Sequence, residues 1–354
     1  MPDEIEIAGR RIGAQHPPFV IAEMSANHNG SFEAACRIVE HAKSAGADAV
    51  KLQTYRPDTL TIRCTRPDFQ IKEGLWAGRT LYDLYAWAHT PWEWHAPLFA
   101  HARKVGITIF SSPFDTSAID LLEDLGAPAY KIASFEAVDL PLIRYAASTA
   151  KPLIISTGMA DMTEIAEAIA AARDGGCRQL ALLHCVSGYP APAADYNLRT
   201  IPDMMARFNV VTGLSDHTLG GTTAIAGVAL GAAVIEKHFT LDRRGGGPDD
   251  SFSLEPDEMA ALCRQAREAW EALGTVNYAR KSSEHANVKF RRSLYFVKDL
   301  RAGEPITPDA VRSIRPGYGV PPKFVDALIG KVVHRDVLAG MPVEWRDLES
   351  GADR

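Results

Sequence analysis

The sequence lacks the features that mark several large classes of protein. Its 354 residues carry a net charge of −6, whereas nucleic-acid-binding chains usually show a basic excess or a basic stripe. The longest apolar runs, such as Ala226 to Ile235, are too short to span a bilayer and contain glycine. The first 13 residues have no apolar segment of the kind that directs secretion. We therefore expect a cytoplasmic protein with no nucleic-acid partner and no membrane partner.

Cysteine is also scarce, and its spacing excludes two kinds of stabilisation. The five cysteines are scattered, and no CxxC pair occurs among them. A disulfide framework or a zinc knuckle would need paired or regularly spaced cysteines, so we expect free thiols in a reducing compartment. A GxGxxG fingerprint is missing after the first apolar segment, which argues against a doubly wound dinucleotide-binding sheet.

What the chain does contain is a regular alternation of short apolar runs and longer amphipathic segments. The expected strands are 19–24, 47–52, 107–111, 129–133, 153–156, 180–184, 210–213 and 233–237. A strand followed by a helix implies parallel strands joined by right-handed crossovers. Eight such units in roughly 250 residues is the size of a (β/α)8 TIM barrel. We therefore predict a barrel domain over residues 1–274, preceded by a hairpin at its start.

The composition and the hydrophobic periodicity of the sequence change after Gly274. Residues 275–289 are polar without a clear period, which is typical of a linker. Beyond them an internal repeat occurs, in which Asp299 to Ile306 (DLRAGEPI) is echoed by Asp336 to Val343 (DVLAGMPV). Each copy reads as a short strand, an Ala-Gly turn and another strand. We predict a small domain of short strands over residues 290–354.

Polar side chains follow every expected strand at its carboxyl end, where the chemistry of a barrel is located. Lys51 and Lys131 lie at two of these ends, and hydroxyl groups lie at others: Ser112, Ser134, Ser156 and Ser215. A lysine gives a point charge and a serine an adaptable donor, so the set favours a cradle for phosphate or carboxylate. The serines could instead cap helices. Lys131 could also form a Schiff base, as in an aldolase.

Two histidines come from the last two expected strands. Ser215 and His217 share one strand face, and Glu236 and His238 share another, while Lys237 points the opposite way. The imidazoles can therefore converge beside a carboxylate, a donor set that suits a divalent ion such as Mn²⁺, Zn²⁺ or Fe²⁺. A histidine at a strand end can equally be a hydrogen-bonded structural group, and spacing alone leaves both interpretations open.

Several ordered motifs at the strand ends resemble the sialic acid synthase family. They are Ile21–Gly30 (IAEMSANHNG), Asp48–Thr54 (DAVKLQT), Tyr130–Ser134 (YKIAS), Ser156–Met159 (STGM), Gly213–Thr218 (GLSDHT) and Glu236–Thr240 (EKHFT). The resemblance covers nearly the whole chain. The segment after the linker, with Arg315-Pro-Gly317 and the repeat, looks like that family's C-terminal antifreeze-like (SAF) domain.

The resemblance implies a metal-dependent condensation of phosphoenolpyruvate with an acetamido sugar in its aldehyde form. The implied metal ligands are His217 and His238, with Mn²⁺ expected and Mg²⁺ or Co²⁺ as alternatives. The implied phosphoenolpyruvate-binding residues are Lys51, Ser112, Lys131, Ser134, Ser156, Ser187 and Ser215. The implied sugar-binding residues are Gln53, Tyr189, Asp249 and Arg315. The implied catalytic carboxylates are Glu23, Glu136 and Glu236.

The resemblance also implies a homodimer with exchanged C-terminal domains, in which Arg315 reaches into the barrel of the partner. Two other classes of function stay open at this point. A Schiff-base aldolase would use Lys131, and a sugar- or ice-binding protein would act through the SAF-like domain. The convergent charges of the barrel argue against the second alternative, because isolated buried charges are costly.

Overall fold

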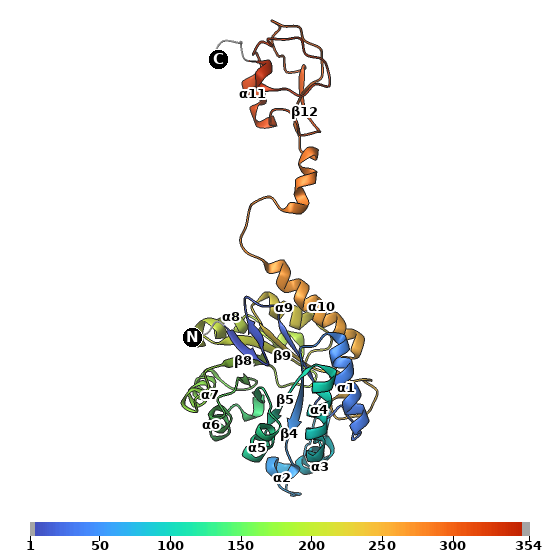
Figure 1. Cartoon of the computed structure of the whole chain (residues 1–354), viewed down its shortest axis with the longest axis vertical. Helices are drawn as coiled ribbons and strands as arrows, with labels where there is room; N and C mark the ends of the chain where they lie inside the picture. The colour runs from blue at the N-terminus through green and yellow to red at the C-terminus, as the bar shows by residue number, and fades with distance from the viewer. Residues whose placement is uncertain (1–3, 349–354) are drawn as a thin grey trace. The chain divides into compact units, whose positions relative to one another are not determined.

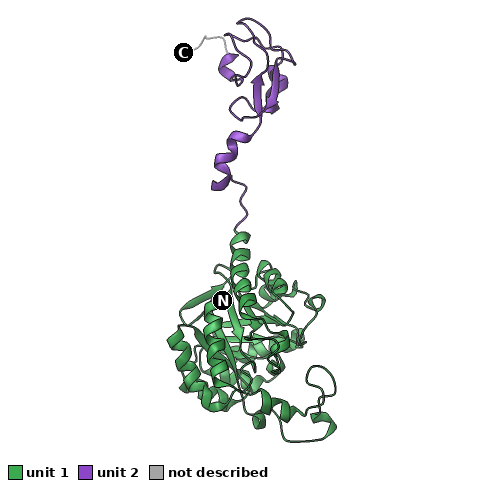
Figure 2. Cartoon of the chain, turned by 90° about the vertical axis from the view of Figure 1, so that its right-hand side faces the viewer, with its two compact units in different colours: residues 1–274 green, residues 275–354 purple. Residues whose placement is uncertain are grey.

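The computed structural model describes residues 4–348 and consists of two compact units, Met1–Gly274 and Thr275–Arg354 (Figure 2). The ends of the two predicted domains, residues 1–3 and 349–354, lie outside the described residues. Among the described residues, no helix has the length and apolar character needed to cross a membrane.

The first unit contains a closed barrel of eight parallel strands (Figure 1). In chain order they are β3 (Phe19–Glu23), β4 (Ala49–Thr54), β5 (Thr108–Pro113), β6 (Tyr130–Ile132), β7 (Leu153–Ser156), β8 (Leu180–Cys185), β9 (Val211–Asp216) and β10 (Val234–His238). Each strand pairs with the next, and β10 closes the ring by pairing with β3. The predicted TIM-barrel fold is confirmed.

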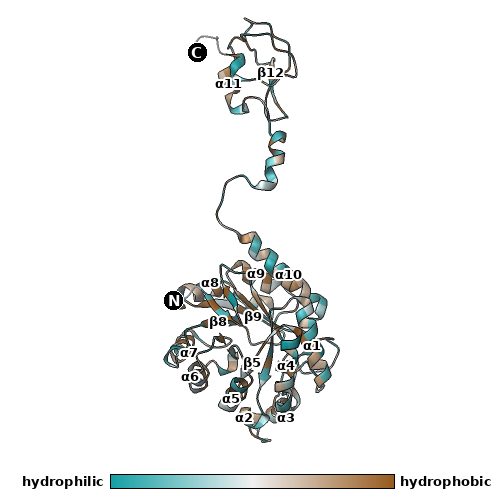
Figure 3. Cartoon of the chain, viewed as in Figure 1, coloured by the Kyte–Doolittle hydropathy of each residue, from teal (hydrophilic) through white to brown (hydrophobic). Residues whose placement is uncertain are grey.

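Helices form the outer layer of the barrel. They are α1 (Phe32–Ala45), α2 (Pro57–Leu60), α3 (Leu81–Ala88), α4 (His95–Val105), α5 (Thr116–Asp124), α6 (Leu140–Ser148), α7 (Met162–Asp174), α8 (Thr200–Phe208), α9 (Thr222–Ala229) and α10 (Pro256–Leu273). The outer helices carry both apolar and polar residues (Figure 3). In α1, Ser31 caps the start by accepting from the Ala34 amide, and Gly46 closes the end in the left-handed conformation.

A hairpin closes the amino-terminal end of the barrel. It consists of β1 (Glu4–Ile7) and β2 (Arg10–Gly13), which pair antiparallel. Ile5, Ile7 and Ile12 are buried against the first residues of several strands, among them Phe19 and Val211. Full burial of such a side chain contributes roughly 1.5–3 kcal/mol, so the hairpin is firmly attached. Only the carboxyl ends of the strands are left for a site.

The second unit has its own core, which includes Leu294, Phe296 and Val337. Its strands β11 (Ser293–Phe296) and β12 (Val311–Ile314) pair antiparallel, and α11 (Val325–Leu328) follows them. Short 3-10 segments complete the chain: η1 (Pro67–Phe69), η2 (Trp92–Trp94), η3 (Ser134–Glu136), η4 (Ala193–Asp195), η5 (Asp250–Phe252), η6 (Ser282–Phe290), η7 (Pro322–Phe324) and η8 (Trp345–Asp347). Segment η6 lies mostly within the predicted linker, where the sequence shows no period.

The internal repeat has a reciprocal structure. The carboxylate of Asp299, in the first copy, accepts from the Ala339 amide in the second copy at 2.8 Å. Asp336, in the second copy, accepts from the Ala302 amide in the first, also at 2.8 Å. Each aspartate thus accepts a hydrogen bond from a turn amide of the other copy. The backbones of Leu300 and Val337 also exchange two hydrogen bonds of 2.9 Å. The repeat therefore encodes a pair of mutually capped turns.

Candidate active site

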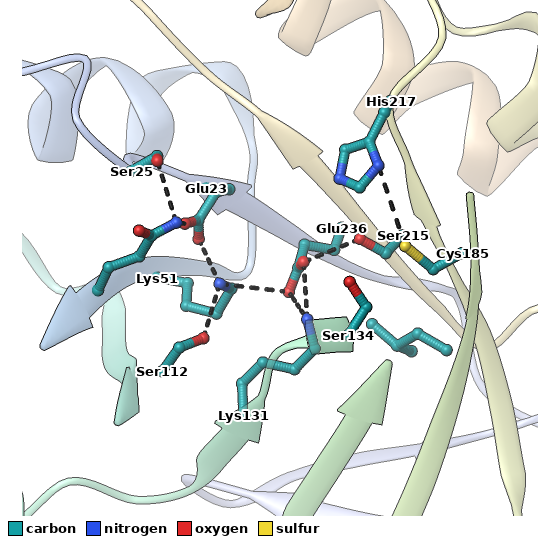
Figure 4. A network of polar contacts seen from close by, with 12 residues as sticks. Glu23, Ser25, Lys51, Ser112, Lys131, Ser134, Cys185, Ser215, His217 and Glu236 are labelled. Carbon is teal, nitrogen blue, oxygen red and sulfur yellow. Dashed lines mark hydrogen bonds and ion pairs between the residues drawn. The ribbon is translucent and has the colours of Figure 1, made fainter. Parts of the chain in front are cut away.

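A cluster of buried charges lies at the carboxyl ends of the barrel strands (Figure 4). Lys51 Nζ, on β4, lies 2.7 Å from Glu23 Oε2 and 3.8 Å from Glu236 Oε2. Lys131 Nζ, on β6, donates to both carboxylate oxygens of Glu236, at 2.9 and 3.1 Å. All four side chains are 5% exposed or less. Residues separated by up to 213 positions in the sequence thus share one buried network.

The strand register explains why these groups meet. Glu23, the last residue of β3, is level with Lys51 on one side and with His238 on the other. Side chains alternate along a strand, so Glu236 and His238 project from the same face of β10. Lys237 projects from the opposite face, as expected, and bonds to Asp216 instead. The barrel register therefore places the charged groups and a histidine at the same end.

The two carboxylates of this cluster differ in proton affinity. Burial raises the pKa of Glu23 to about 7, against the opposing effect of the Lys51 charge. Burial would also raise the pKa of Glu236, but the charges of Lys131 and Lys51 outweigh it and hold that pKa at about 2. Environments that push two carboxyl pKa values apart separate an acid/base group from a permanent anion. Glu23 is therefore the member of this pair that can exchange a proton near neutral pH.

Hydroxyl groups surround the lysines. Ser112 accepts from Lys51 Nζ at 3.0 Å, and Ser215 donates to Glu236 at 3.0 Å. Two further hydroxyls, of Ser134 and Ser187, lie 2.9 Å apart. The Ser156 hydroxyl is buried without a hydrogen-bond partner among the described residues. An unpartnered buried hydroxyl beside paired ones is a donor available to a ligand.

A glycine allows the close approach of the β6 and β8 ends. A Cβ on Gly158 would lie 2.3 Å from the Cβ of Ser134 and 2.7 Å from the Ser187 hydroxyl. The backbone there has a φ of +48°, in the left-handed region that favours glycine. The glycine of the Ser156–Met159 motif is therefore required for the serine pair to form.

His217 and His238 face each other across the ends of β9 and β10. Their ring centroids lie 5.4 Å apart. His217 Nδ1 donates to the Val186 carbonyl at 2.8 Å, which fixes the tautomer that leaves a lone pair on Nε2. Nδ1 of His238 is buried and has no hydrogen-bond partner among the described residues. The unpartnered Nδ1 of His238 contrasts with a structural histidine such as His184, whose Nε2 bonds to the Tyr196 carbonyl.

The two imidazoles fit a divalent ion as donors. Burial lowers the pKa of both side chains, so neutral rings with free lone pairs are available. Within residues 4–348, no group of three or more histidine, cysteine or carboxylate side chains is arranged to hold a metal. An ion held by His217 and His238 alone would keep open coordination positions, which a catalytic site needs for substrate or water.

Two of the predicted sugar-binding residues, Tyr189 and Asp249, lie beside the histidines, and a third, Gln53, is linked to Asp249 through Ser25. The ring of Tyr189 lies 4.5 Å from the ring of His217. Gln53 Nε2 donates to Glu23 Oε1 and to Ser25 Oγ, both at 3.0 Å. Ser25 donates in turn to Asp249, whose Oδ2 lies 4.0 Å from His238 Nδ1. A chain of polar contacts thus links the cluster to the loop after β10.

Two further predicted residues, Glu136 and Arg315, lie in η3 and in the second unit, respectively. Glu136, in η3, has a carboxylate oxygen buried without a hydrogen-bond partner, and burial raises its pKa to about 7. It lies shortly after Lys131 in the chain but is not hydrogen-bonded to the cluster. Arg315 belongs to the second unit, so the first unit alone does not contain it.

The structure adds residues that sequence reasoning did not identify. Asp250 accepts from Asn29 Nδ2 at 2.9 Å, from the Gly247 amide at 2.8 Å and from Thr240 Oγ1 at 2.5 Å. This clasp, formed by Asp250 with Asn29, Thr240 and Gly247, holds the glycine-rich loop after β10 against the loop after β3. The run of glycines before two aspartates indicates an unusual loop in the sequence, but Asn29, the partner of Asp250, lies 221 positions away in the chain.

Trp76 is a second unforeseen residue. Its indole Nε1 donates to the Pro248 carbonyl at 2.9 Å, and its ring lies 5.8 Å from that of Tyr189. The segment before α3 therefore reaches the loop after β10. Phe252, whose ring lies 4.9 Å from the ring of His238, completes an aromatic wall on this side.

Comparison with known proteins gives a consistent result. The model of the NeuB family matches residues 38–278, and that of the SAF domain matches residues 291–349. A pseudaminic acid synthase of Campylobacter jejuni is 43% identical over 94% of this chain and 96% of its own length. An N,N'-diacetyllegionaminic acid synthase of the same species is 36% identical over 90% of this chain and 96% of its own.

A solved structure extends the comparison to three dimensions. The N-acetylneuraminic acid synthetase of Leptospira borgpetersenii, in complex with citrate, superposes with a TM-score of 0.72 at 30% identity. The match covers 81% of this chain and 96% of that chain.

Proposed function

Since this chain belongs to the NeuB family, we propose that it is a pseudaminic acid synthase that joins phosphoenolpyruvate to 2,4-diacetamido-2,4,6-trideoxy-L-altrose. The products are pseudaminic acid and phosphate. One observation carries the proposal: two lysines and two carboxylates share a buried cluster beside two facing histidines. The higher identity to the pseudaminic acid synthase than to the legionaminic acid synthase of the same species supports the choice of sugar.

The charges of the cluster suit the binding of an anionic substrate. With all four groups ionised, Lys51 and Lys131 are balanced by Glu23 and Glu236. Phosphoenolpyruvate adds negative charge, which raises the pKa of Glu23 above about 7 and makes its carboxylate a stronger base once the substrate is bound. Lys51 and Lys131 would form ion pairs with the substrate, and the serine hydroxyls would donate hydrogen bonds to its oxygens.

His217 and His238 would hold a divalent ion, for which we propose Mn²⁺, with Mg²⁺ or Co²⁺ as alternatives. When bound, the ion supplies Lewis-acid polarisation of the aldehyde oxygen of the sugar. Gln53, Tyr189 and Asp249 would orient the sugar beside it. Holding two substrates in line can lower a barrier by several kcal/mol, and the crowding of polar groups serves that alignment.

The chemical step forms two bonds to carbon, from C3 of phosphoenolpyruvate to the aldehyde carbon and from C2 to a water oxygen, and it breaks the bond between C2 and the phosphate oxygen. The aldehyde oxygen becomes a hydroxyl by taking up a proton that the water releases. Water adds at C2 and gives a proton to a carboxylate, for which Glu23 and Glu136 are the candidates. The tetrahedral intermediate then expels phosphate and leaves the ketone of the product. Glu236 stays ionised throughout and keeps Lys131 in place.

The assembly and location are proposed on the same basis. We propose a homodimer in which the Arg315 of one chain completes the sugar site of the other, since the second unit has a core of its own. We also propose a cytoplasmic location, which suits the five free cysteines.

A panel of acetamido sugars tests the function. Each sugar is incubated with phosphoenolpyruvate and Mn²⁺, and phosphate release and product mass are recorded. We expect turnover with the diacetamido trideoxy-altrose. Preference for N-acetylmannosamine or for the legionaminate precursor would instead make the chain an N-acetylneuraminate or legionaminate synthase. Borohydride trapping of pyruvate on Lys131 would indicate a Schiff-base aldolase, a different class that the ion pair of Lys131 with Glu236 opposes.

A further inference from the structure

Lys237 and Asp216 form a buried ion pair to which no role has been given. Nζ of Lys237 lies 2.8 Å from Asp216 Oδ2, and both side chains are about 1% exposed. Desolvation of two charges costs several kcal/mol per ion, so a buried pair is poor evidence for a contribution to stability alone. Its position suggests another purpose.

Each member of the pair precedes one of the two facing histidines. Asp216 is followed by His217, and Lys237 is followed by His238. The two residues are also level with each other in the register of β9 and β10. Because side chains alternate along a strand, the ion pair lies on the face of the sheet opposite to that of His238.

The pair also holds the turn that carries His217. Asp216 Oδ1 accepts from the Thr218 amide at 2.9 Å and from the Thr218 hydroxyl at 2.8 Å. Lys237 Nζ donates to the carbonyl of Thr218 as well. The residues on both sides of His217 are thus bound to the residue that precedes His238.

Other contacts of His217 lead to a different strand. Its amide donates to the Tyr196 hydroxyl at 2.6 Å, and its carbonyl accepts from the Ala191 amide at 3.0 Å. These contacts tie His217 to the segment after β8. The side chain of Lys237 adds a link from the same turn to β10, the strand of His238, beyond the backbone pairing of β9 with β10.

We propose that Lys237, acting through Asp216 and Thr218, is a positioning residue that sets the separation of His217 and His238 for a divalent ion. This inference rests on the proposed function, in which the two histidines hold the metal. The ion pair fixes the backbone next to His217 and next to His238, so the two imidazole rings are pre-organised before the ion binds.

The test uses Mn²⁺ binding to the full-length chain, stripped of metal and titrated by electron paramagnetic resonance without substrates. The double variant Asp216→Asn/Lys237→Met removes both charges, so no orphan charge remains to unfold the barrel. We expect a melting temperature near that of the wild type and a Kd for Mn²⁺ that is weaker by about 10–100-fold, as for lost supporting residues of metal ligands. Thr218→Val, a milder change, should give a smaller loss in the same direction.

The control variant is Lys151→Met, which breaks the ion pair of Lys151 with Glu123, 2.6 Å long and remote from the histidines. It should leave the Kd for Mn²⁺ unchanged. Unchanged Mn²⁺ affinity in a folded double variant, or in Thr218→Val if the double variant does not fold, would overturn the positioning role alone. Failure of the wild type to bind Mn²⁺ would overturn the metal assignment itself, and the inference with it.

Discussion

Two carboxyl groups with similar proton affinity stand near the proposed reaction centre. Burial brings the pKa of both Glu23 and Glu136 to about 7, so a titration alone cannot distinguish them. The contacts of the two carboxyl groups distinguish them, because Glu23 contacts Lys51 and Gln53, whereas Glu136 is not hydrogen-bonded to the cluster. We infer that Glu23 is the group that takes the proton from water.

The variant Glu23→Gln tests this inference through the pH profile. A base must be deprotonated to act, so the wild-type rate should rise as pH increases through about 7. The variant should lose that limb and about 10²–10⁴-fold in kcat, the usual contribution of a general base. Glu136→Gln is the matched control and should keep the limb. A limb that persists in Glu23→Gln and disappears in Glu136→Gln would assign the base to Glu136.

The raised pKa of Glu23 also has a consequence for stability. A carboxyl whose folded pKa exceeds its unfolded value contributes stability that is present at low pH and is lost as pH rises through the folded pKa. The wild type should therefore lose stability relative to Glu23→Gln between about pH 5 and pH 8. Urea titrations at several pH values measure the difference, which a constant gap would contradict.

His217→Ala tests the metal site. Removal of one of two protein ligands should weaken Mn²⁺ binding by more than the ~10–100-fold typical of supporting residues, so added Mn²⁺ should not restore turnover. His101→Ala, on α4, is the control because His101 pairs with the half-exposed Glu40. Metal content equal to that of the wild type in His217→Ala would refute the assignment.

The sequence predicts much of this site because strand ends are recognisable locally. Lys51 and Lys131 stand next to apolar runs, and a closed barrel forces such ends together. It could not predict that Glu236 would join both lysines, since that pairing depends on side-chain conformations across strands far apart in the chain. Neither could it reveal the unpartnered hydroxyl of Ser156.

At the scale of secondary-structure elements, strand positions can be predicted from local sequence, whereas contacts between loops depend on residues far apart in the chain. The eight strands were predicted within a few residues, because apolar runs and closing glycines are local signals; β9 nevertheless extends to Asp216, three residues further than expected. The Asp250 clasp was beyond prediction, since it joins loops 221 positions apart. The polar stretch before β11 gave no helical period, yet η6 forms there with 3-10 geometry.

The clasp predicts the effect of Gly247→Ala. A Cβ at this position would lie 1.8 Å from Asn29 Oδ1, so the loop must shift and carry Asp249 with it. We expect the KM for the sugar to rise about tenfold, equivalent to about 1.4 kcal/mol, while the KM for phosphoenolpyruvate stays near its original value. Gly246→Ala is the matched control. Gly246 has a φ of +80° but open space around it, so alanine there adds backbone strain without the collision. Equal effects from both variants would contradict the role of the clasp.

At the scale of the whole molecule, the proposed exchange of C-terminal units makes each active site depend on two chains. A chain that ends at Gly274 should keep a folded barrel, because the core of the first unit is its own, but should lack turnover without Arg315. Circular dichroism and phosphate release measure the two properties. Full activity in the shortened chain would contradict the requirement for the second unit.

Complementation tests the exchange itself. Arg315→Ala and His217→Ala chains are each expected to be inactive alone. In a mixed dimer with exchanged units, the His217→Ala chain supplies its Arg315 to an intact barrel, so co-expression should restore part of the activity. Continued inactivity of the mixed dimers would indicate that each chain completes its own site.

The fate of the bridging oxygen of phosphoenolpyruvate tests the central claim most directly. The enzyme is supplied with Mn²⁺, the diacetamido trideoxy-altrose and phosphoenolpyruvate that carries ¹⁸O between C2 and phosphorus. Because water adds at C2, we predict that the label leaves in the phosphate, alongside a product with the mass of pseudaminic acid. Label retained in the organic product, or phosphate released at the same rate without the sugar, would contradict the proposed condensation.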